Sequence, residues 1–342
     1  MLKQISLLIL CAAAIVWFAT PVQACTSAVV SGKVTPDGRP LLWKNRDTDF
    51  MQNHIDYVKG EKYNFIAVVN SANAYLKEAW MGTNSSGFAL MNTQSYNLVD
   101  VKGDEERGAA NGRVIYRALE VCATIEDFCH FLDTISKPSD IEANFGVIDA
   151  QGGAAMFEVD YHKYVMYDAN NPKDAPYGYI ARTNFSFAGK VNEGAGYVRY
   201  MEADQVLMKA SATGSITPQF IFNDLSRSFR NRMLDIDLRS GAYNRPQASG
   251  WFVDQDFIPR SSTSCSVVVQ GVKPGEKAEL TTMWTLLGYP PTGIAIPLWV
   301  KDAGKLLPGM VRFGKEHEAA PLSDWSLRLA DRVFSYKQGM GT

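Results

Sequence analysis

The chain has 342 residues, of which 46% are hydrophobic and 20% are charged, a composition that excludes a disordered or fibrous protein. Lysine and arginine number 34 against 36 aspartate and glutamate, and neither sign forms a long run. This balance gives no indication of a nucleic-acid partner or of binding to an anionic membrane surface.

The first 24 residues have the pattern of a secretory signal peptide. Lys3 precedes an apolar stretch over residues 5–18, and Val22 and Ala24 are the small or aliphatic residues that precede a cleavage site. The apolar stretch is shorter than the roughly 20 residues that span a bilayer. We therefore expect cleavage after Ala24, a secreted or periplasmic protein without a membrane span, and one domain over residues 25–342.

The segments that follow the expected cleavage site indicate a group of strands. A hairpin is expected around the turn signal Pro36-Asp37-Gly38, and turn-forming residues separate the later segments. Alternation and β-branched residues predict strands at 26–31, 41–44, 63–69, 75–81 and 88–93. This first part of the chain should therefore form antiparallel sheet.

Helices and further strands alternate in the rest of the chain. Thr124 and Asp127 resemble a capping box that starts a helix ending near Thr134. Helices are also expected at 110–122, 197–209 and 217–229, a hairpin at 145–149 with 154–159, and a last strand pair at 264–270 with 280–286. The order predicts an α+β fold.

Four cysteines remain once Cys11 leaves with the signal peptide: Cys25, Cys122, Cys129 and Cys265. They are too few for a disulfide scaffold, and the two that flank a helix start, Cys122 and Cys129, are expected to be buried free thiols. The histidines, at positions 54, 130, 162 and 317, lack the spacing of metal ligands. We expect no metal and assign no cofactor.

The first expected hairpin gathers reactive residues. Because its turn centres near residue 36 or 37, residue 25 should lie opposite residues 47–49, so that Cys25 begins a strand beside Lys44-Asn45-Arg46-Asp47. Cleavage after Ala24 would give Cys25 a thiol and a free α-amine on one residue. This combination predicts a nucleophilic cysteine that carries its own base.

The chemistry of such a cysteine assigns roles to its neighbours. An α-amine, with a pKa of about 7.7 to 8.0, can take the thiol proton and return it to a leaving amine. Asp47 is the candidate to hydrogen-bond the ammonium and orient it. Lys44 or Arg46 is the candidate cation that favours the thiolate. No histidine base is required.

A second class of function also fits a cysteine directly after a signal peptide. Bacterial lipoproteins are acylated at such a cysteine, although Gln23 here occupies a position that is normally small in that motif. A lipid-anchored binding protein, acylated on Cys25 and without turnover, is therefore the alternative to an enzyme.

A start at Cys25-Thr26-Ser27, followed after the hairpin turn by Lys44-Asn45-Arg46-Asp47, resembles the choloylglycine hydrolase and penicillin acyltransferase superfamily of N-terminal-nucleophile hydrolases. The resemblance implies a four-layer αββα sandwich of two antiparallel sheets between helices. It also implies hydrolysis of linear, non-peptide amide bonds, as in small N-acyl amides, bile salt conjugates or penicillin V-type side chains. A secreted dipeptidase with an N-terminal cysteine is the alternative among enzymes, and the oligomeric state is left open.

The same resemblance assigns further site residues. Residues 82–92, GTNSSGFALMN, are similar to the family segment that ends at an oxyanion-hole residue, here Asn92. The segment Ala181-Arg182-Thr183-Asn184-Phe185 looks like the family's Thr-Asn segment, whose asparagine is the other oxyanion donor.

A supporting arginine and an active-site cation complete the set that the resemblance implies. Arg199 is the candidate for the arginine that supports the site, and Arg260 is the alternative for that role. Bile salt hydrolases and penicillin V acylases carry arginine where Lys44 aligns. The choice of active-site cation between Lys44 and Arg46 therefore stays open.

Overall fold

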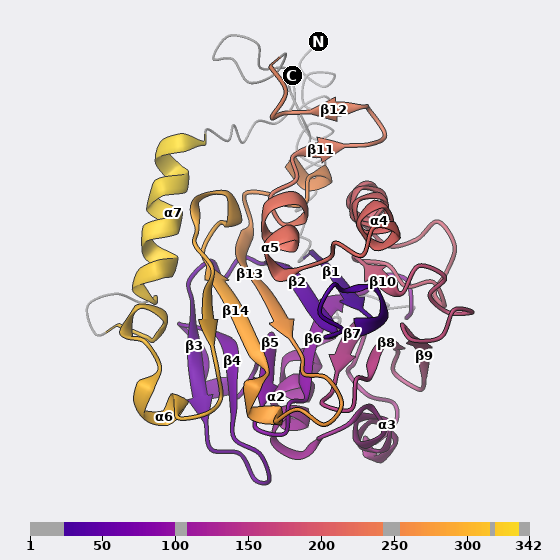
Figure 1. Cartoon of the computed structure of the whole chain (residues 1–342), viewed down its shortest axis with the longest axis vertical. Coiled ribbons are helices and arrows are strands. Elements are labelled where there is room, and N and C mark those ends of the chain that lie inside the picture. The colour runs from indigo at the N-terminus through magenta and orange to yellow at the C-terminus, as the bar shows by residue number, and fades with distance from the viewer. Residues whose placement is uncertain (1–23, 100–107, 242–253, 315–318, 335–342) are drawn as a thin grey trace, which may run out of the picture.

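Two antiparallel sheets form the centre of the structure (Figure 1). The computed structural model describes residues 24–99, 108–241, 254–314 and 319–334. The expected signal peptide therefore lies outside the described residues, except for Ala24. No helix in the described ranges is long and apolar enough to cross a membrane.

The first sheet is built from segments that are far apart in the sequence. Within the described residues its strand order is β10-β1-β2-β13-β14-β15. The strands are β1 (Cys25–Val30), β2 (Leu41–Asp47), β10 (Tyr179–Arg182), β13 (Thr263–Gln270), β14 (Thr282–Leu287) and β15 (Ile296–Leu298). The central hairpin of β1 and β2 is therefore flanked by strands from the middle and from the last third of the chain.

The second sheet follows the chain order from β3 to β9. Its strands are β3 (Asn53–Val58), β4 (Phe65–Asn70), β5 (Met81–Asn84), β6 (Ala89–Gln94), β7 (Ala143–Ile148), β8 (Ala154–Val159) and β9 (Tyr164–Asp168). The strand expected at 75–81 is wrong. The chain makes a 3-10 turn at Ala74–Leu76, and Lys77 then adopts a left-handed conformation (φ 54°) that interrupts an extended run.

Helices and one small hairpin complete the described structure. They are α2 (Asn111–Val121), α3 (Ile125–Thr134), α4 (Tyr197–Ala212), α5 (Pro218–Phe220), α6 (Ala303–Leu306), α7 (Pro321–Val333), β11 (Arg230–Asn231) and β12 (Ile236–Asp237). The capping box of Thr124 and Asp127 at α3 is confirmed. The helix expected at 217–229 is wrong in length, because α5 becomes a π-helical turn at Ile221–Leu225. Ser226 and Ser228 then bond to Trp43 and Glu202.

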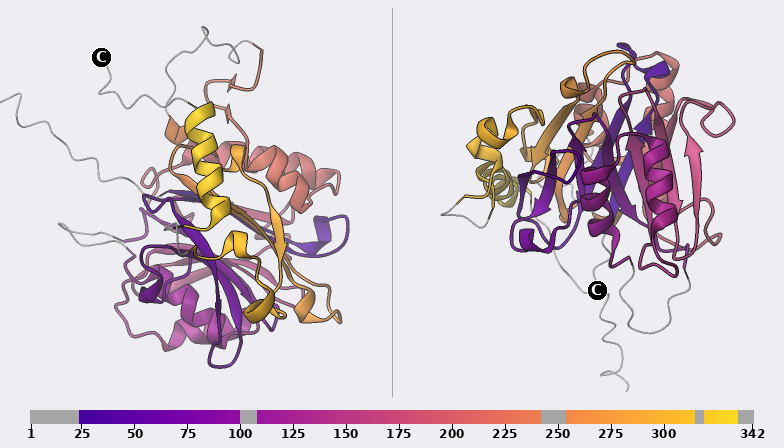
Figure 2. Two further views of the ribbon diagram at one scale, coloured as in Figure 1. Left: turned by 90° about the vertical axis from the view of Figure 1, so that its left-hand side faces the viewer. Right: turned by 90° about the horizontal axis from the view of Figure 1, so that it is seen from below.

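Three hydrophobic clusters define the layers. Val29 and Met91 belong to the cluster between the two sheets, and Phe128 of α3 belongs to the cluster on the outer face of the second sheet. Trp43 of β2 and Leu207 of α4 share the cluster on the outer face of the first sheet. Figure 2 shows α2 and α3 on one side of the sheets and α4 on the other. The four-layer αββα sandwich is confirmed.

Candidate active site

Cys25 is the first residue of β1, and it pairs with Arg46 of β2. The expected register, with residue 25 opposite 47–49, is wrong. The last pair of the ladder is Val30 with Leu41, which centres the loop between residues 35 and 36. A 3-10 turn at Gly32–Val34 forms part of this loop. The correction moves Arg46 directly beside Cys25.

The side chain of Cys25 faces the second sheet. Side chains alternate along a strand, and Val29 of the same face lies in the core between the sheets. Directly paired residues share a face, so Arg46 and Lys44 of β2 also face the second sheet. On β13, Cys265 pairs with Arg46 from the other side. The candidate nucleophile therefore lies among two cations and a second thiol.

Lys44 is buried and bonded to neutral oxygens. Its Nζ donates to the carbonyl oxygen of Trp80 at 3.1 Å and to Asn92 Oδ1 at 2.9 Å. Burial lowers the pKa of Lys44, and the neighbouring Cys25 opposes this effect. This contact places the predicted oxyanion residue Asn92, on β6, within hydrogen-bond distance of Lys44.

Arg46 connects the two sheets across the site. Its Nη1 and Nη2 donate to Asn53 Oδ1 at 2.6 Å and Asn70 Oδ1 at 2.7 Å, on β3 and β4. Its guanidinium lies 4.7 Å from the centroid of the Trp80 ring. Burial lowers the pKa of Arg46. Both terminal nitrogens of this cation are therefore committed to asparagine side chains.

The carboxylate of Asp47 is held by residues 260–263. Thr263 Oγ1 donates to Oδ1 at 2.6 Å, and Arg260 Nε lies 3.0 Å from Oδ2. Although it is within ion-pair distance, Oδ2 accepts no well-aligned hydrogen bond from the described residues. Burial raises the pKa of Asp47, and the charges of Arg260 and Arg199 oppose this. The main-chain oxygen of Asp47 lies 4.0 Å from Cys25 Sγ.

Arg199, in the first turn of α4, is bonded directly to the residue that begins β1. Its Nη1 donates to the Cys25 carbonyl oxygen at 2.7 Å and to Thr26 Oγ1 at 2.9 Å. Its Nη2 donates to Asn184 Oδ1 at 2.7 Å. Burial, followed by the charge of Arg260, lowers the pKa of Arg199 to about 10. Arg199 therefore has the supporting position, whereas Arg260 binds Asp47.

A glycine makes room for this arginine. Gly196 precedes α4 with φ of 85°, a left-handed conformation that side-chain-bearing residues rarely adopt. A Cβ atom on Gly196 would lie 2.5 Å from Arg199 Nη2 and 2.9 Å from Thr183 Oγ1. The turn into α4 and the placement of Arg199 therefore both require glycine here.

Asn184 contacts Cys25 through its side chain. Its Oδ1 accepts from the Cys25 nitrogen at 3.1 Å, and its Nδ2 donates to the carbonyl oxygen of Gln94 at 2.8 Å. The segment before Asn184 is anchored by Arg182, whose Nε lies 2.6 Å from the buried carboxylate of Glu158. The orientation of the Asn184 amide is set by its own partners, the Cys25 nitrogen, Arg199 and the Gln94 carbonyl oxygen.

The structure thus brings all seven predicted site residues into one connected group: Cys25, Lys44, Arg46, Asp47, Asn92, Asn184 and Arg199. Their roles in a reaction stay predictions at this point. Their arrangement provides a buried thiol, two amide side chains and several cations at the end of one hairpin. Such a set of groups can attack a carbonyl carbon and stabilise the resulting oxyanion.

A sequence profile of the family described as acyl-coenzyme A:6-aminopenicillanic acid acyl-transferase matches residues 34–211, just over half of the chain. The chain belongs to this family. The resemblance seen in the sequence is therefore confirmed. The matched range contains six of the seven predicted site residues, and Cys25 precedes it. No curated protein matches the sequence at a significant level.

Solved structures with a related arrangement include three amide hydrolases. A conjugated bile acid hydrolase from Clostridium perfringens is 14% identical, with a TM-score of 0.47 and coverage of 80% of this chain and 92% of the hydrolase. A penicillin V acylase from Agrobacterium tumefaciens is 15% identical (TM-score 0.41; 80% and 86%). The Caenorhabditis elegans N-acylethanolamine-hydrolyzing acid amidase ortholog is 15% identical (TM-score 0.40; 59% and 89%). Similarity at this level says nothing about the substrate of this acyl-transferase family member.

Sequence reasoning missed several residues that complete the site. Thr263 reaches it from the first position of β13, and Gln255 reaches it from the turn before that strand. Trp80, Asn53 and Asn70 surround Arg46. No local pattern marks these residues, because they contact the first hairpin only after the two sheets pack.

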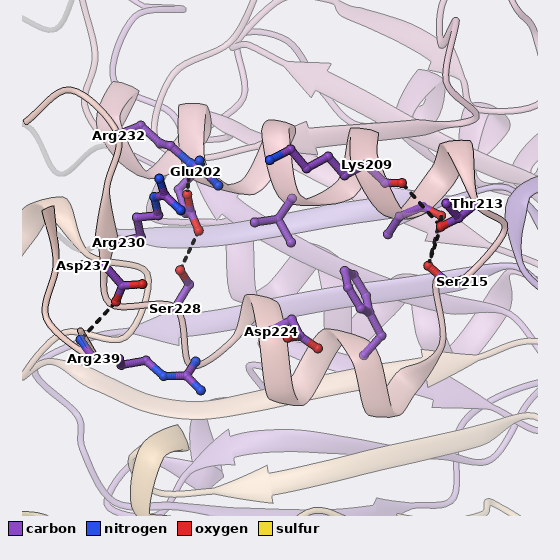
Figure 3. Close-up of a pocket in the computed structure, with 13 residues that line it drawn as sticks. Glu202, Lys209, Thr213, Ser215, Asp224, Ser228, Arg230, Arg232, Asp237 and Arg239 are labelled. Atoms are coloured by element: carbon purple, nitrogen blue, oxygen red, sulfur yellow. Dashed lines mark hydrogen bonds and ion pairs between the residues drawn. The ribbon is translucent and has the colours of Figure 1, made fainter. Parts of the chain in front are cut away.

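The pocket drawn in Figure 3 is not lined by Cys25. It lies between α4, α5 and the β11–β12 hairpin, and its volume is about 410 Å³. Charged side chains of both signs line it, including Glu202, Lys209 and Asp224, and Glu202 is already bonded to Ser228 and Arg232. It contains none of the seven site residues.

The cysteines outside the site are free thiols, as expected. Cys122 is buried and Cys129 is half-buried. Burial raises the pKa of Cys122 to about 12, which keeps this thiol protonated and unreactive. In the described part of the chain, no group of three or more histidine, cysteine, aspartate and glutamate side chains could hold a metal ion.

Proposed function

We propose that the chain is exported, cut between Ala24 and Cys25, and then hydrolyses a linear amide bond through an acyl-enzyme on Cys25. One observation carries the proposal: Cys25 begins β1 with its nitrogen on Asn184 Oδ1 and its carbonyl oxygen on Arg199. Membership of the acyl-transferase family supports acyl transfer as the class of reaction.

Cleavage would convert the Cys25 nitrogen from a peptide N–H into a basic amine. The amine takes the thiol proton, and the thiolate attacks the carbonyl carbon to give a tetrahedral oxyanion. As the C–N bond breaks, the ammonium gives its proton to the leaving amine and a thioester remains. Water, deprotonated by the same amine, then cleaves the thioester and restores Cys25.

Asp47 and the two asparagines have separate roles in this scheme. Asp47 Oδ2 is a buried acceptor without a well-aligned hydrogen bond, which suits it to receive one from the ammonium. Asn184 and Asn92 are assigned as the donors to the oxyanion. Nδ2 of Asn92 makes no hydrogen bond within the described residues, and its Oδ1 is fixed by Lys44.

Between the two candidate cations, the contacts favour Lys44. An ammonium group has three N–H donors, and two are used by Trp80 and Asn92. Arg46 has five N–H donors, of which two bind asparagine oxygens on the second sheet. Cys25 is the strongest of the charges that oppose the lowered pKa of Lys44, whereas for Arg46 Cys265 comes before Cys25. We therefore assign Lys44 to the thiolate and Arg46 to the support of the two sheets.

The first test is the intact mass and the N-terminal peptide of the exported protein. The proposal predicts a chain that begins at Cys25 with a free amine. A diacylglyceryl group on Cys25 would favour the lipid-anchored binding protein, and a start elsewhere would remove the amine that the mechanism needs.

The second test is hydrolysis by the Cys25→Ala variant. Penicillin V, glycine-conjugated bile salts, N-acyl amino acids and dipeptides are assayed, and the variant should fold with no hydrolysis of any of them. Cys129→Ser, which changes a half-buried thiol outside the site, is the matched control and should keep full activity. Full activity of Cys25→Ala would exclude the nucleophile, and activity on dipeptides alone would favour a dipeptidase.

A further inference from the structure

A short turn reaches the site from a loop that carries none of the seven predicted residues. Gln255 lies in the 3-10 turn at Asp254–Asp256. Its main-chain oxygen accepts from Arg199 Nε at 3.2 Å, and its Oε1 accepts from Arg260 Nη1. Gln255 is exposed, whereas Arg199 and Arg260 are only 1% and 3% exposed. One exposed residue is therefore bonded to two buried cations.

Arg199 and Arg260 carry the same charge and repel each other, so their orientations depend on the acceptors around them. After burial, the charge of Arg260 is the main cause that lowers the pKa of Arg199. Arg260 Nε lies 3.0 Å from Asp47 Oδ2 and 3.1 Å from Ser262 Oγ. A guanidinium is planar, so an acceptor on Nη1 restricts its rotation and favours the orientation in which the Nε edge faces Asp47.

The turn is closed by contacts that do not involve the Gln255 side chain. Asp254 Oδ2 accepts from the Ser261 nitrogen at 2.9 Å and from Ser261 Oγ at 2.7 Å. Thr263 Oγ1 accepts from the Arg260 nitrogen at 3.0 Å. A change in the Gln255 side chain therefore removes one acceptor while these contacts keep the loop in place.

We propose that Gln255 is a positioning residue for the reaction assigned to Cys25, an inference that rests on the function proposed above. Its side-chain oxygen keeps Arg260 on Asp47. Its main-chain oxygen keeps Arg199 on the Cys25 carbonyl and on Asn184.

The pH dependence of the reaction distinguishes this role from a structural one. Asp47 must be ionised to accept from the ammonium, so activity falls as the pH drops through its pKa. Burial and Asp254 raise the pKa of Asp47, whereas Arg260, Arg199 and the Thr263 hydroxyl lower it. When Arg260 turns away, its lowering effect weakens and the pKa rises. The acidic limb of kcat/KM then moves to higher pH.

The test compares three variants of the exported protein on the substrate that it hydrolyses. Gln255→Met has a side chain of similar length without an acceptor, and kcat should fall about tenfold while KM changes by less than about twofold. The acidic limb should move up. Gln255→Glu keeps an oxygen at the same reach and should retain most of the kcat. Gln219→Met, at an exposed glutamine of α5, is the matched control and should behave like the parent protein.

Any one of three other results would overturn the inference. A parent-like kcat in Gln255→Met, a fall in kcat without movement of the acidic limb, or equal losses in Gln255→Met and Gln255→Glu would each exclude a positioning role for the side-chain oxygen. If Cys25→Ala stays fully active, the proposed function itself fails and this inference fails with it. The two failures are therefore distinguishable.

Discussion

Asn184 uses one oxygen atom for two hydrogen bonds, to the Cys25 nitrogen and to Arg199 Nη2. An alanine there would leave both buried donors without their acceptor. The cost of unsatisfied buried donors is about 1–3 kcal/mol each, so loss of activity in Asn184→Ala would be mixed with loss of stability. The role of the amide nitrogen needs a substitution that keeps the oxygen.

Asn184→Asp is that substitution. It keeps an oxygen for Arg199 and Cys25 and replaces the Nδ2 donor by a second oxygen. If Nδ2 stabilises the oxyanion, kcat should fall by about 10²–10³. The second oxygen would also face the carbonyl oxygen of Gln94, which accepts from Nδ2 at 2.8 Å in the parent protein, so the urea midpoint of unfolding should fall as well. Steady-state kinetics and urea unfolding check this result. A kcat within about threefold of the parent would exclude Asn184 as an oxyanion donor.

Residues of the site differ in how far the sequence could reveal them. Cys25 and Asp47 follow from the hairpin and from the chemistry of an N-terminal thiol, even though the predicted register was wrong. Asn184 and Arg199 needed the family resemblance. Thr263 could not be predicted, because it reaches Asp47 only through the pairing of β2 with β13, more than two hundred positions later. Gln255 contacts the nearby Arg260, but its contact with Arg199 joins residues that are 56 positions apart.

At the scale of elements, the start of α4 controls the site. Gly196 precedes the helix in a left-handed conformation, and Arg199 follows within the first helical turn. The side chain of Arg199 therefore returns toward the residue that begins the turn. A change in this turn should reach the Cys25 carbonyl through Arg199.

Gly196→Ala tests this connection. The left-handed backbone costs about 1–2 kcal/mol for alanine, and the new Cβ would displace Arg199 from its buried acceptors. Gly214→Ala is the matched control, because Gly214 also has a positive φ (59°) but nothing lies within 4 Å of the added Cβ. The urea midpoint of unfolding and kcat should both fall further in Gly196→Ala than in Gly214→Ala. Equal effects in the two variants would contradict the role of Arg199.

Local signals predicted some elements and failed for others. The capping box at Thr124 and the hairpin of β7 and β8 are correct because side-chain caps and tight turns act over a few residues. The short strands β3, β9, β10 and β15 and the helix α7 were not predicted. The four strands lie at the edges of the two sheets, where each pairs with a single neighbour. The helix α7 is as amphipathic as α3, so its sequence did carry a helical signal.

At the scale of the whole molecule, burial of Lys44 links the site to global stability. The folded protein holds this cation between the sheets, and burial lowers its pKa. Between the lowered pKa and the unfolded value of about 10.5, the unfolded chain binds more protons than the folded chain. The free energy of unfolding contributed by Lys44 therefore rises with pH in that window.

Lys44→Met removes this dependence. The difference in unfolding free energy between the variant and the parent should shift in favour of the parent as the pH approaches about 10.5. Urea unfolding at several pH values measures it. A difference that stays constant over the window would show that burial does not disfavour the charged form of Lys44.

The layer order could be predicted only through the family resemblance. Hydrophobic alternation indicates which residues of β1 and β2 are buried, but both faces of this hairpin are buried, one against the second sheet and one against α4. Nothing in a local segment shows that β10 and β13 flank it. Such pairings form between distant segments and leave no periodic signal.

The ladder of β1 begins at the same residue that the proposed cleavage would make the amino terminus. Among the described residues, no strand pair would be lost when the leader is removed. The described fold would therefore be the same before and after cleavage. The leader would act as a protecting group on the α-amine of Cys25 until the protein is exported. The precursor would therefore be inactive, because its Cys25 nitrogen is a peptide N–H that cannot accept the thiol proton.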